Sequence, residues 1–172
     1  MYKIVPVEEI PIGEDINIDN HEEILDLYNI LIKFAISNDY PLGLSAVQLG
    51  IPKKFFIARC SIPDIIGHAG LEYVGYANCT YTSTKDNILE IMSTEGCLSI
   101  PGLLYDVKRF VHIHMIGYMM TIDPISLAVE MIQINTDIKN QLISVILQHE
   151  IDHQHGILIS DLGTELEAKV IK

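Results

Sequence analysis

Residues 148–156 read QHEIDHQHG and hold the side chains with the clearest capacity for chemistry in this sequence. Among them, His149, Glu150 and His153 form the pattern HExxH. Residues four apart on a helix lie on the same face, so both imidazoles can reach one cation while Glu150 lies beside it. Such an arrangement suits hydrolysis assisted by a divalent metal ion, with the carboxylate as general base.

The alternative explanation of this pattern is a set of polar residues on an exposed helix face. Against it, the three residues share a helical stripe with Leu142, Val145 and Ile146, which we expect to face the core. Buried histidines and a buried carboxylate need partners, and a metal ion provides one. We therefore favour a metal site.

Two histidines do not complete a catalytic metal site, which usually has three protein ligands. In the longer pattern HExxHxxGxxH a third histidine follows downstream, but Ile159 occupies that position. Glu165 and Glu167 follow too closely, on what we expect to be a frayed tail. The third ligand must therefore come from upstream, although we expect the histidines there to face solvent. The upstream candidates are His68, His112, His114, Cys60, Cys79 and Cys97.

Cys97 lies in the segment STEGCLSIPG, residues 93–102, where glycines and a proline shape the backbone around it. Together with HEIDH and with PLGLSAVQLG, residues 41–50, this segment resembles the peptide deformylase family in three motifs and in their order. The family's EGCLS and HExDH are complete, and its GxGxAAxQ is matched at Gly43, Ala46 and Gln48. The resemblance covers most of the chain, from Asn20 to Asp161.

Some positions depart from the family pattern. Pro41 replaces the first glycine of the first motif, Ser45 replaces an alanine, and Gln154 stands where leucine is usual. We also expect the family's N-terminal strand and C-terminal helix to be shortened or absent. These departures remove neither a ligand nor the base, but Pro41 removes one backbone N–H near the substrate.

The resemblance implies a metal-dependent hydrolase that removes the formyl group from N-formyl-methionine at the start of newly synthesised peptides and releases formate. It implies that Cys97, His149 and His153 hold the ion, leaving a fourth coordination position open to water. The native ion would be Fe(II), with zinc, nickel or cobalt as substitutes. The implied partners are N-formyl-methionyl nascent peptides and, through them, the ribosome.

In the implied mechanism, Glu150 takes a proton from the attacking water and passes it to the departing nitrogen. The Gln48 side-chain amide and the Leu98 backbone N–H meet the charge that develops on the formyl oxygen. Glu95 and Arg109 match the family's paired acid and arginine, which are expected to brace the cysteine loop and the helix.

Specificity for methionine requires an apolar pocket beside the ion. Part of its wall is expected from the helix that carries the histidines, and part from the first and second motifs. An extended substrate can also pair with the backbone there as an added strand. The predicted lining residues are Leu42, Gly43, Gly96, Leu142, Val145 and Ile146.

Three other functions are compatible with the same residues. An HExxH metallopeptidase of another kind must find a third ligand that the downstream sequence does not offer. A catalytically silent deformylase-like domain that binds metal or peptide ends has Pro41 and the short termini in its favour. A structural zinc site predicts that chelation unfolds the protein.

Two helices are expected to organise the chain. Apolar residues at helical spacing from Ile138 onward, ended by Gly156, predict the helix that carries HExxH. An amphipathic helix is predicted over residues 21–38, where Asn20 and Glu23 resemble a capping box.

The remaining elements are predicted strands and loops. Residues 54–59, 73–81 and 88–92 are rich in β-branched and aromatic residues, which favours strands. Residues 109–120 and 126–134 predict an antiparallel hairpin with its turn at Asp123 and Pro124, and residues 39–54 predict a packed loop. We therefore expect an α+β fold, with antiparallel or mixed β-sheets packed around a central HExxH helix and an additional N-terminal helix.

Length and composition limit the remaining possibilities. With 172 residues, the chain is expected to form a single catalytic domain over residues 1–172. A formal net charge of -12, from 11 Lys and Arg against 23 Asp and Glu, argues against direct nucleic acid binding. The N-terminus lacks the apolar run of a secretion signal and no long apolar segment follows, so we expect a cytoplasmic protein without a membrane association.

Overall fold

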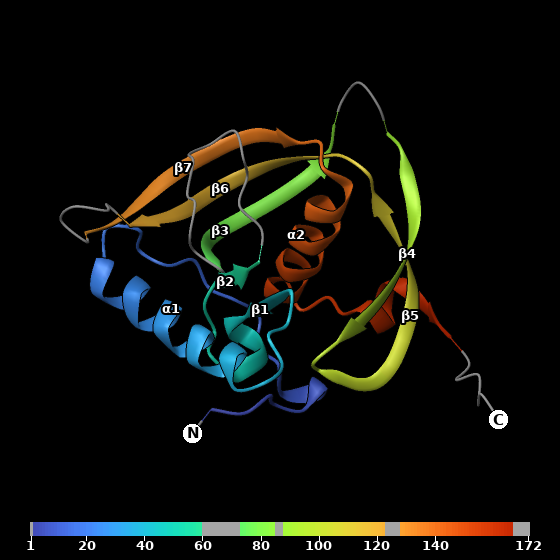
Figure 1. The fold of residues 1–172 in the computed structure, drawn as a ribbon, viewed down its shortest axis with the longest axis horizontal. Coiled ribbons are helices and arrows are strands. Elements are labelled where there is room, and N and C mark those ends of the chain that lie inside the picture. The colour runs from blue at the N-terminus through green and yellow to red at the C-terminus, as the bar shows by residue number, and fades with distance from the viewer. Residues whose placement is uncertain (1, 60–72, 85–87, 123–127, 167–172) are drawn as a thin grey trace.

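The structure is a computed structural model that describes residues 2–59, 73–84, 88–122 and 128–166. Two antiparallel sheets and the helix α2 between them form its framework (Figure 1). This arrangement confirms the predicted α+β fold with a central HExxH helix and an N-terminal helix. The larger sheet has the order β1-β2-β3-β6-β7 and consists of Gly43–Ser45, Phe55–Ala58, Val74–Ser83, Ile113–Ile122 and Val129–Ile138. The smaller sheet has the order β4-β5-β8 and consists of Glu90–Cys97, Ile100–Phe110 and Gly163–Glu165. The helices are η1 (Val7–Glu9), α1 (His21–Ile36), η2 (Ala46–Leu49), α2 (Gln141–Gln154) and α3 (Ile159–Leu162).

The larger sheet separates two apolar cores because its strands alternate their side chains between the two faces. On β2, Phe55 and Ile57 join the core beneath α1, whereas Phe56 and Ala58 join the core beneath α2. All four side chains are fully buried. Strand β2 must therefore be apolar on both faces, and the face with Phe56 and Ala58 forms part of the surface on which α2 packs.

Helix α1 forms where the sequence predicts it. Asn20 caps its first turn, since the side-chain oxygen accepts a hydrogen bond from the Glu23 backbone N–H and the side-chain amide bonds to the Glu23 carboxylate. Ile24, Leu31 and Ala35 are fully buried on its inner face. The Asn20 cap and the apolar stripe thus fix both the start and the orientation of this helix.

Helix α2 begins later than its apolar pattern predicts. Ile138 belongs to β7, where it pairs with Ile113 of β6, and its side chain is buried in the sheet. The helix starts at Gln141, after Asn140 caps it by accepting a hydrogen bond from the Ile143 backbone N–H. Ladder pairing with β6 therefore outweighed helical periodicity over residues 135–138.

The segment predicted as a packed loop contains two short elements. Gly43–Ser45 forms the edge strand β1, and Ala46–Leu49 forms the 3-10 helix η2. The loop prediction was therefore wrong for both segments: β1 pairs with β2, and η2 carries Gln48 into the interior. A three-residue strand is too short to show an alternating pattern in the sequence.

The cysteine motif also lies on strands. The strand predicted over residues 88–92 extends through Cys97 as β4 and turns back as β5, a strand that the sequence pattern did not reveal. The N-terminal half of β5 is largely exposed and lacks alternation, which explains why it was missed. The hairpin formed by β6 and β7 is confirmed, but its first strand starts later than predicted, because Arg109 and Phe110 belong to β5. The predicted turn at Asp123 and Pro124 lies outside the described residues.

Residues 159–165 form regular structure and not the frayed tail that the sequence predicts. After α3, the strand β8 pairs with Tyr105, Asp106 and Val107 of β5, and the Tyr105 hydroxyl donates a hydrogen bond to Glu165. Glu167 lies outside the described residues. Within the described part of the chain, no helix is long and apolar enough to cross a membrane.

Gln154 is a buried amide at the end of α2 whose side-chain oxygen and nitrogen have no hydrogen-bond partner among the described residues. Replacing it with leucine removes two unsatisfied polar atoms, so we expect Gln154→Leu to raise the free energy of unfolding by about 1–3 kcal/mol. Urea denaturation of the metal-free protein measures this change.

Gln148 provides the matched control, because its amide bonds to the backbone of Phe110 and to Ser144. We expect Gln148→Leu to destabilise the protein, since it leaves backbone groups of β5 without these partners. Equal destabilisation by both substitutions would contradict this account of Gln154.

Candidate active site

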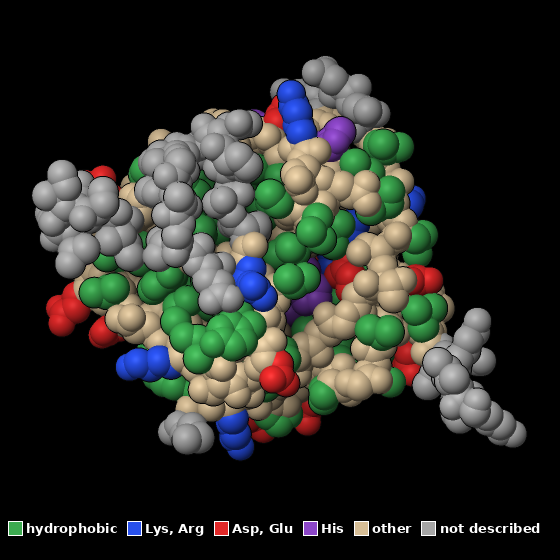
Figure 2. All heavy atoms as spheres, viewed as in Figure 1, with side chains coloured by type: hydrophobic (Ala, Val, Ile, Leu, Met, Phe, Trp, Pro, Cys, Tyr) green, Lys and Arg blue, Asp and Glu red, His purple; other side chains and the backbone are tan. Residues whose placement is uncertain are grey.

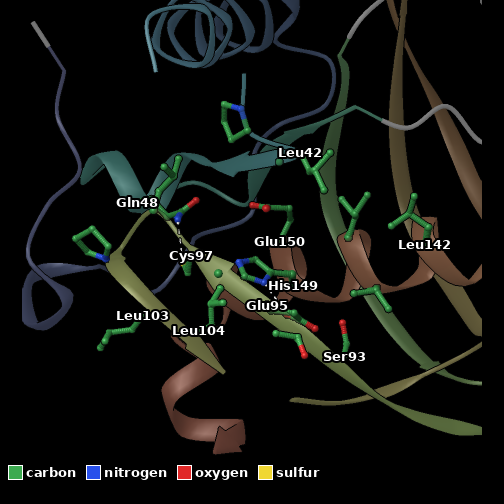
Figure 3. A pocket seen from close by; sticks show the side chains of 18 of the residues that line it. Leu42, Gln48, Ser93, Glu95, Cys97, Leu103, Leu104, Leu142, His149 and Glu150 are labelled. Atoms are coloured by element: carbon green, nitrogen blue, oxygen red, sulfur yellow. Dashed lines mark hydrogen bonds and ion pairs between the residues drawn. The ribbon is translucent and has the colours of Figure 1, made fainter. Parts of the chain in front are cut away.

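A cavity of about 780 Å³ opens between α2, β1 and the β4–β5 hairpin. In the space-filling view, apolar side chains surround a hollow in which histidine and acidic side chains are visible (Figure 2). His149 and Glu150 project into it from α2, Gln48 from η2, and Cys97 from the end of β4 (Figure 3). All three sequence motifs therefore meet at one site.

Three potential metal ligands converge at the inner end of this cavity. Cys97 Sγ lies 3.3 Å from His153 Nε2, which lies 3.1 Å from His149 Nε2. One ligand atom from each residue lies within 4.8 Å of the other two. Tetrahedral ligands with bonds of about 2.0–2.3 Å are separated by roughly 3.3–3.7 Å, so this group of atoms suits a single ion.

The donor types also fit a divalent transition metal. One thiolate and two imidazoles are borderline-soft ligands of the kind that zinc and iron accept. Burial, followed by the nearby charges of His149 and Arg109, holds the pKa of His153 well below its usual range. His153 is therefore neutral, as a metal ligand must be.

Glu95 orients His149. Its Oε2 atom accepts a hydrogen bond from His149 Nδ1 over 2.9 Å, which leaves Nε2 directed toward Cys97 and His153. Burial opposes ionisation of Glu95, but hydrogen bonds from Arg109 and His149 lower its pKa to about 2. The carboxylate therefore stays charged and fixes the tautomer of the imidazole.

The surroundings of His149 stabilise positive charge on its imidazole. Burial alone would lower its pKa, but hydrogen bonds to Cys97 and Glu95 and the charge of Glu150 raise the pKa of His149 to about 10. The same surroundings that hold this proton can hold a metal cation in its place.

Arg109 binds Glu95, as the resemblance implied, and also binds Asp152 of α2. Its Nε and Nη2 atoms donate to the two oxygens of Glu95 over 2.8 and 2.9 Å, and Nη1 donates to Asp152. The Arg109 side chain is only 2% exposed, so this ion pair is shielded from water. It ties β4 and β5 to α2 directly beneath the metal ligands.

Glu150 has the environment of a general base. It is 4% exposed, and its Oε2 atom has no hydrogen-bond partner among the described residues. Burial raises its pKa to about 7, despite the opposing influence of His149 and Arg109. A carboxyl group near neutrality can both accept and donate a proton at the working pH.

Gln48 is buried between the first and second motifs. Its Oε1 atom accepts a hydrogen bond from the Ser45 backbone N–H, and its Nε2 atom donates to Ser99 Oγ over 3.0 Å and contacts Cys97 Sγ at 3.6 Å. The amide N–H groups therefore face the cysteine rather than solvent. Leu98, the next residue after Cys97, also lines the cavity.

All six predicted pocket residues line the cavity: Leu42, Gly43, Gly96, Leu142, Val145 and Ile146. Leu142 was nevertheless expected to face the core, and this expectation was wrong because its side chain is 63% exposed at the cavity mouth. Leu42 and Leu104 lie on opposite sides of His149 and Glu150 (Figure 3). Motif reasoning missed the lining residues contributed by the turn and strands of the β4–β5 hairpin: Ser93, Thr94, Pro101, Gly102, Leu103 and Leu104.

The other candidate ligands lie elsewhere. His114 pairs with Asp137 across β6 and β7 and is about one-third exposed, and His112 is half-buried beside it. Cys79 is fully buried in the core beneath α2, and its thiol bonds to the Ala77 carbonyl. His68 and Cys60 lie outside the described residues.

Gly43 leaves the space that Glu150 occupies. A Cβ atom at position 43 would lie 2.6 Å from Glu150 Cδ and 2.7 Å from its Cγ. We expect Gly43→Ala to displace this carboxylate and to lower kcat/KM about 100-fold, the scale of a misplacement of roughly 1 Å. Steady-state kinetics on the formylated methionyl peptide that the sequence resemblance implies as substrate measures the effect.

Gly96→Ala is the matched control, because its Cβ would meet only Leu104 Cδ2 at 3.3 Å and the Leu103 carbonyl at 3.9 Å. It is expected to cause a much smaller loss. The steric role of Gly43 would be refuted by two variants of equal activity.

Comparisons with known proteins agree with this geometry. Residues 8–169 match the family described as polypeptide deformylase. A peptide deformylase from Helicobacter pylori is 28% identical over 149 residues, which cover 87% of this chain and 75% of the relative. A peptide deformylase from Desulfotalea psychrophila is 30% identical over 131 residues, covering 76% of this chain and 68% of the relative.

Solved structures share the fold at lower sequence identity. A probable peptide deformylase from a Synechococcus phage superposes with a TM-score of 0.68 at 22% identity, covering 94% of this chain and 99% of that chain. A class I type b peptide deformylase from Acinetobacter baumannii superposes with a TM-score of 0.70 at 19% identity, covering 94% and 98% of the two chains.

Proposed function

Because the chain belongs to the polypeptide deformylase family and is a metal-dependent hydrolase of formylated peptides, we propose that Cys97, His149 and His153 hold its metal ion. The observation that carries this proposal is the convergence of the three ligand atoms beside the buried Glu150 carboxylate. We also propose that residues 1–172 act as one catalytic domain.

When bound, a divalent ion supplies Lewis acidity that polarises the formyl carbonyl and makes a water molecule more acidic. Glu150 accepts a proton from the attacking water. The same side chain then donates this proton to the nitrogen of the methionine as the formamide bond breaks, releasing formate and a free amine. The apolar surroundings that raise the pKa of Glu150 favour both steps.

Charge that develops on the formyl oxygen needs donors that are already in place. Gln48 Nε2 is directed at Cys97 by the hydrogen bonds that fix its amide, and the Leu98 backbone N–H follows the same cysteine. We assign both groups to stabilisation of this oxygen. Loss of the fixed amide should therefore slow catalysis more than it weakens substrate binding.

We accordingly expect Gln48→Ala to lower kcat about 100-fold. This is the lower end of the roughly 100-fold to 1,000-fold loss caused by removing one such donor, because the metal ion also stabilises the charge on the formyl oxygen. Its KM should change by less than threefold. Measuring kcat and KM separately tests the assignment, and full turnover by Gln48→Ala would remove Gln48 from this role.

The substrate we propose is the N-formyl-methionyl end of a nascent peptide. Val145 and Ile146 line the side of the cavity formed by α2 and provide an apolar wall for the methionine side chain. Strand β1 lies at the edge of its sheet, so the backbone of Leu42 and Gly43 can pair with an extended peptide.

The identity of the ion and the cellular context are also proposals. Fe(II) is proposed as the native ion, with zinc, nickel or cobalt as substitutes for a site of one thiolate and two imidazoles. A substrate that emerges during synthesis places the enzyme beside the ribosome in the cytoplasm. Binding to nucleic acid itself is not expected at a net charge of -12.

Release of formate from a formylated methionyl peptide by protein loaded with Fe(II) or Ni(II) tests the proposed function. We expect activity that requires the ion and leaves the peptide bonds intact. Peptide cleavage without formate would instead favour another HExxH metallopeptidase, and a metal-loaded but silent protein would favour a binding domain.

A further inference from the structure

Tyr81 connects the larger sheet to the metal-binding helix. It lies on β3, and its hydroxyl donates a hydrogen bond to Asp152 Oδ1 over 2.8 Å. Asp152 lies within the HEIDH segment, directly before the ligand His153. β3 lies on one side of α2, and the hairpin of β4 and β5 lies on the other (Figure 1).

The contact with Tyr81 is the outer end of a continuous line of hydrogen bonds. Asp152 Oδ2 accepts from Arg109 Nη1, and Arg109 grips Glu95 through two further hydrogen bonds. Glu95 Oε2 accepts from His149 Nδ1 over 2.9 Å. The line therefore starts in one sheet, passes through α2 and the other sheet, and ends on a metal ligand.

We propose that Tyr81 is a positioning residue for the metal centre, which holds Asp152 so that Arg109 and Glu95 keep His149 in its ligating orientation. This inference rests on the proposed metal site. It adds to that site a residue from β3 that is neither one of the three potential metal ligands nor one of the residues that line the cavity.

Tyr81 can affect His149 because two carboxylates, Asp152 and Glu95, compete for the guanidinium group of Arg109. Asp152 and Glu95 both bind Arg109, and Tyr81 occupies the Asp152 oxygen that does not accept from Arg109. Without the hydroxyl, Asp152 can rotate and draw Arg109 away from Glu95. Arg109 and Asp152 are only 2% and 5% exposed, so bulk water cannot easily replace the missing donor.

Tyr81 is suited to remain a donor. Burial and the neighbouring Asp152 carboxylate raise the pKa of its hydroxyl above the ordinary value, despite the opposing influence of Arg109, so the proton stays on the oxygen at neutral pH. Its ring also packs against the apolar core beneath α2. Phenylalanine preserves this packing, and Tyr81→Phe therefore removes the hydroxyl alone.

The test measures Co(II) binding and its visible spectrum together with kcat and KM. We expect Tyr81→Phe to weaken Co(II) binding about threefold to tenfold, below the 10–100-fold typical of direct outer-shell partners. We also expect a shift in the Co(II) absorption bands and a fall in kcat with little change in KM.

Tyr28→Phe is the matched control, because it removes a tyrosine hydroxyl that donates over 2.9 Å to the Tyr73 carbonyl, and Tyr28 belongs to the core beneath α1 and not to the core against which Tyr81 packs. It should lower thermal stability without changing Co(II) affinity or the spectrum. If Tyr81→Phe behaves in the same way as this control, the proposal is wrong and Tyr81 is merely structural.

A double-mutant cycle with Asp152→Asn tests the route of the effect. If Tyr81 acts through Asp152, the double variant should bind Co(II) no more weakly than Asp152→Asn alone. Additive losses would overturn the proposal. A wild-type protein without a thiolate-to-cobalt absorption band would refute the metal site itself, and the inference with it, which separates the two failures.

Discussion

Glu150→Gln is expected to lower kcat by about 10²–10⁴-fold while leaving the metal ion bound, because a neutral amide cannot carry the proton from water to the leaving amine. The substitution preserves the size of a side chain that is only 4% exposed. Formate release and metal content, measured on the same preparation, check both parts of this expectation. Loss of the metal together with the activity would contradict a purely catalytic role.

The pH dependence of the free energy of unfolding tests whether Glu150→Gln removes only the titrating carboxyl group or also disturbs the fold. Burial raises the pKa of Glu150 to about 7 in the folded protein, whereas the unfolded chain ionises near its ordinary value of 4.5. The metal-free protein is therefore expected to lose stability as pH rises from about 4.5 to about 7, since the unfolded state releases this proton first.

Glu150→Gln should lack this loss, so its stability relative to the wild type should grow over that interval. Denaturant unfolding at several pH values checks this behaviour. A variant that is less stable than the wild type at every pH would point instead to a structural role for the carboxylate.

Cys97→Ala is expected to abolish turnover at one equivalent of metal. Roughly 10–16 kcal/mol of binding shared among four ligands gives about 3 kcal/mol for each, so losing the thiolate should weaken binding at least 100-fold. Metal content after gel filtration and metal-dependent formate release both report this loss. Cys97 is half-buried and packs only against the small core of Tyr105, Val107 and Ile159, outside the two main cores, so the fold should persist.

Cys79→Ala is the appropriate control, because this thiol is fully buried in the core beneath α2 and belongs to no metal-binding group among the described residues. It should retain one ion and full activity per folded molecule. A Cys97→Ala protein that retained its ion with comparable affinity would show that another residue completes the site.

The helical part of the site could be predicted from the sequence because it depends on local spacing. His149 and His153 lie four apart, and this alone placed both imidazoles on one face of α2. Cys97 is separated from them by more than fifty residues. Its place beside them depends on the β4–β5 hairpin, so the family motif could indicate Cys97 but spacing could not.

The parts that could not be predicted depend on long-range packing. Ile138 fits a helical stripe as well as a strand, and only pairing with Ile113 decides between them. Leu142 fits the core-facing stripe but is 63% exposed, because it lies on the first turn of α2, where the helix lines the open cavity instead of the core. The bond between Tyr81 and Asp152 joins positions 71 apart in the chain and leaves no local pattern.

X-ray absorption spectroscopy of the zinc-loaded protein tests the central claim most directly. The proposed site predicts one sulfur at about 2.3 Å and two imidazole nitrogens at about 2.0–2.1 Å, with a lighter atom completing the coordination. In Cys97→Ala the sulfur contribution should disappear while the imidazole contribution remains in any ion still bound. A wild-type spectrum with only nitrogen and oxygen ligands would contradict coordination by Cys97.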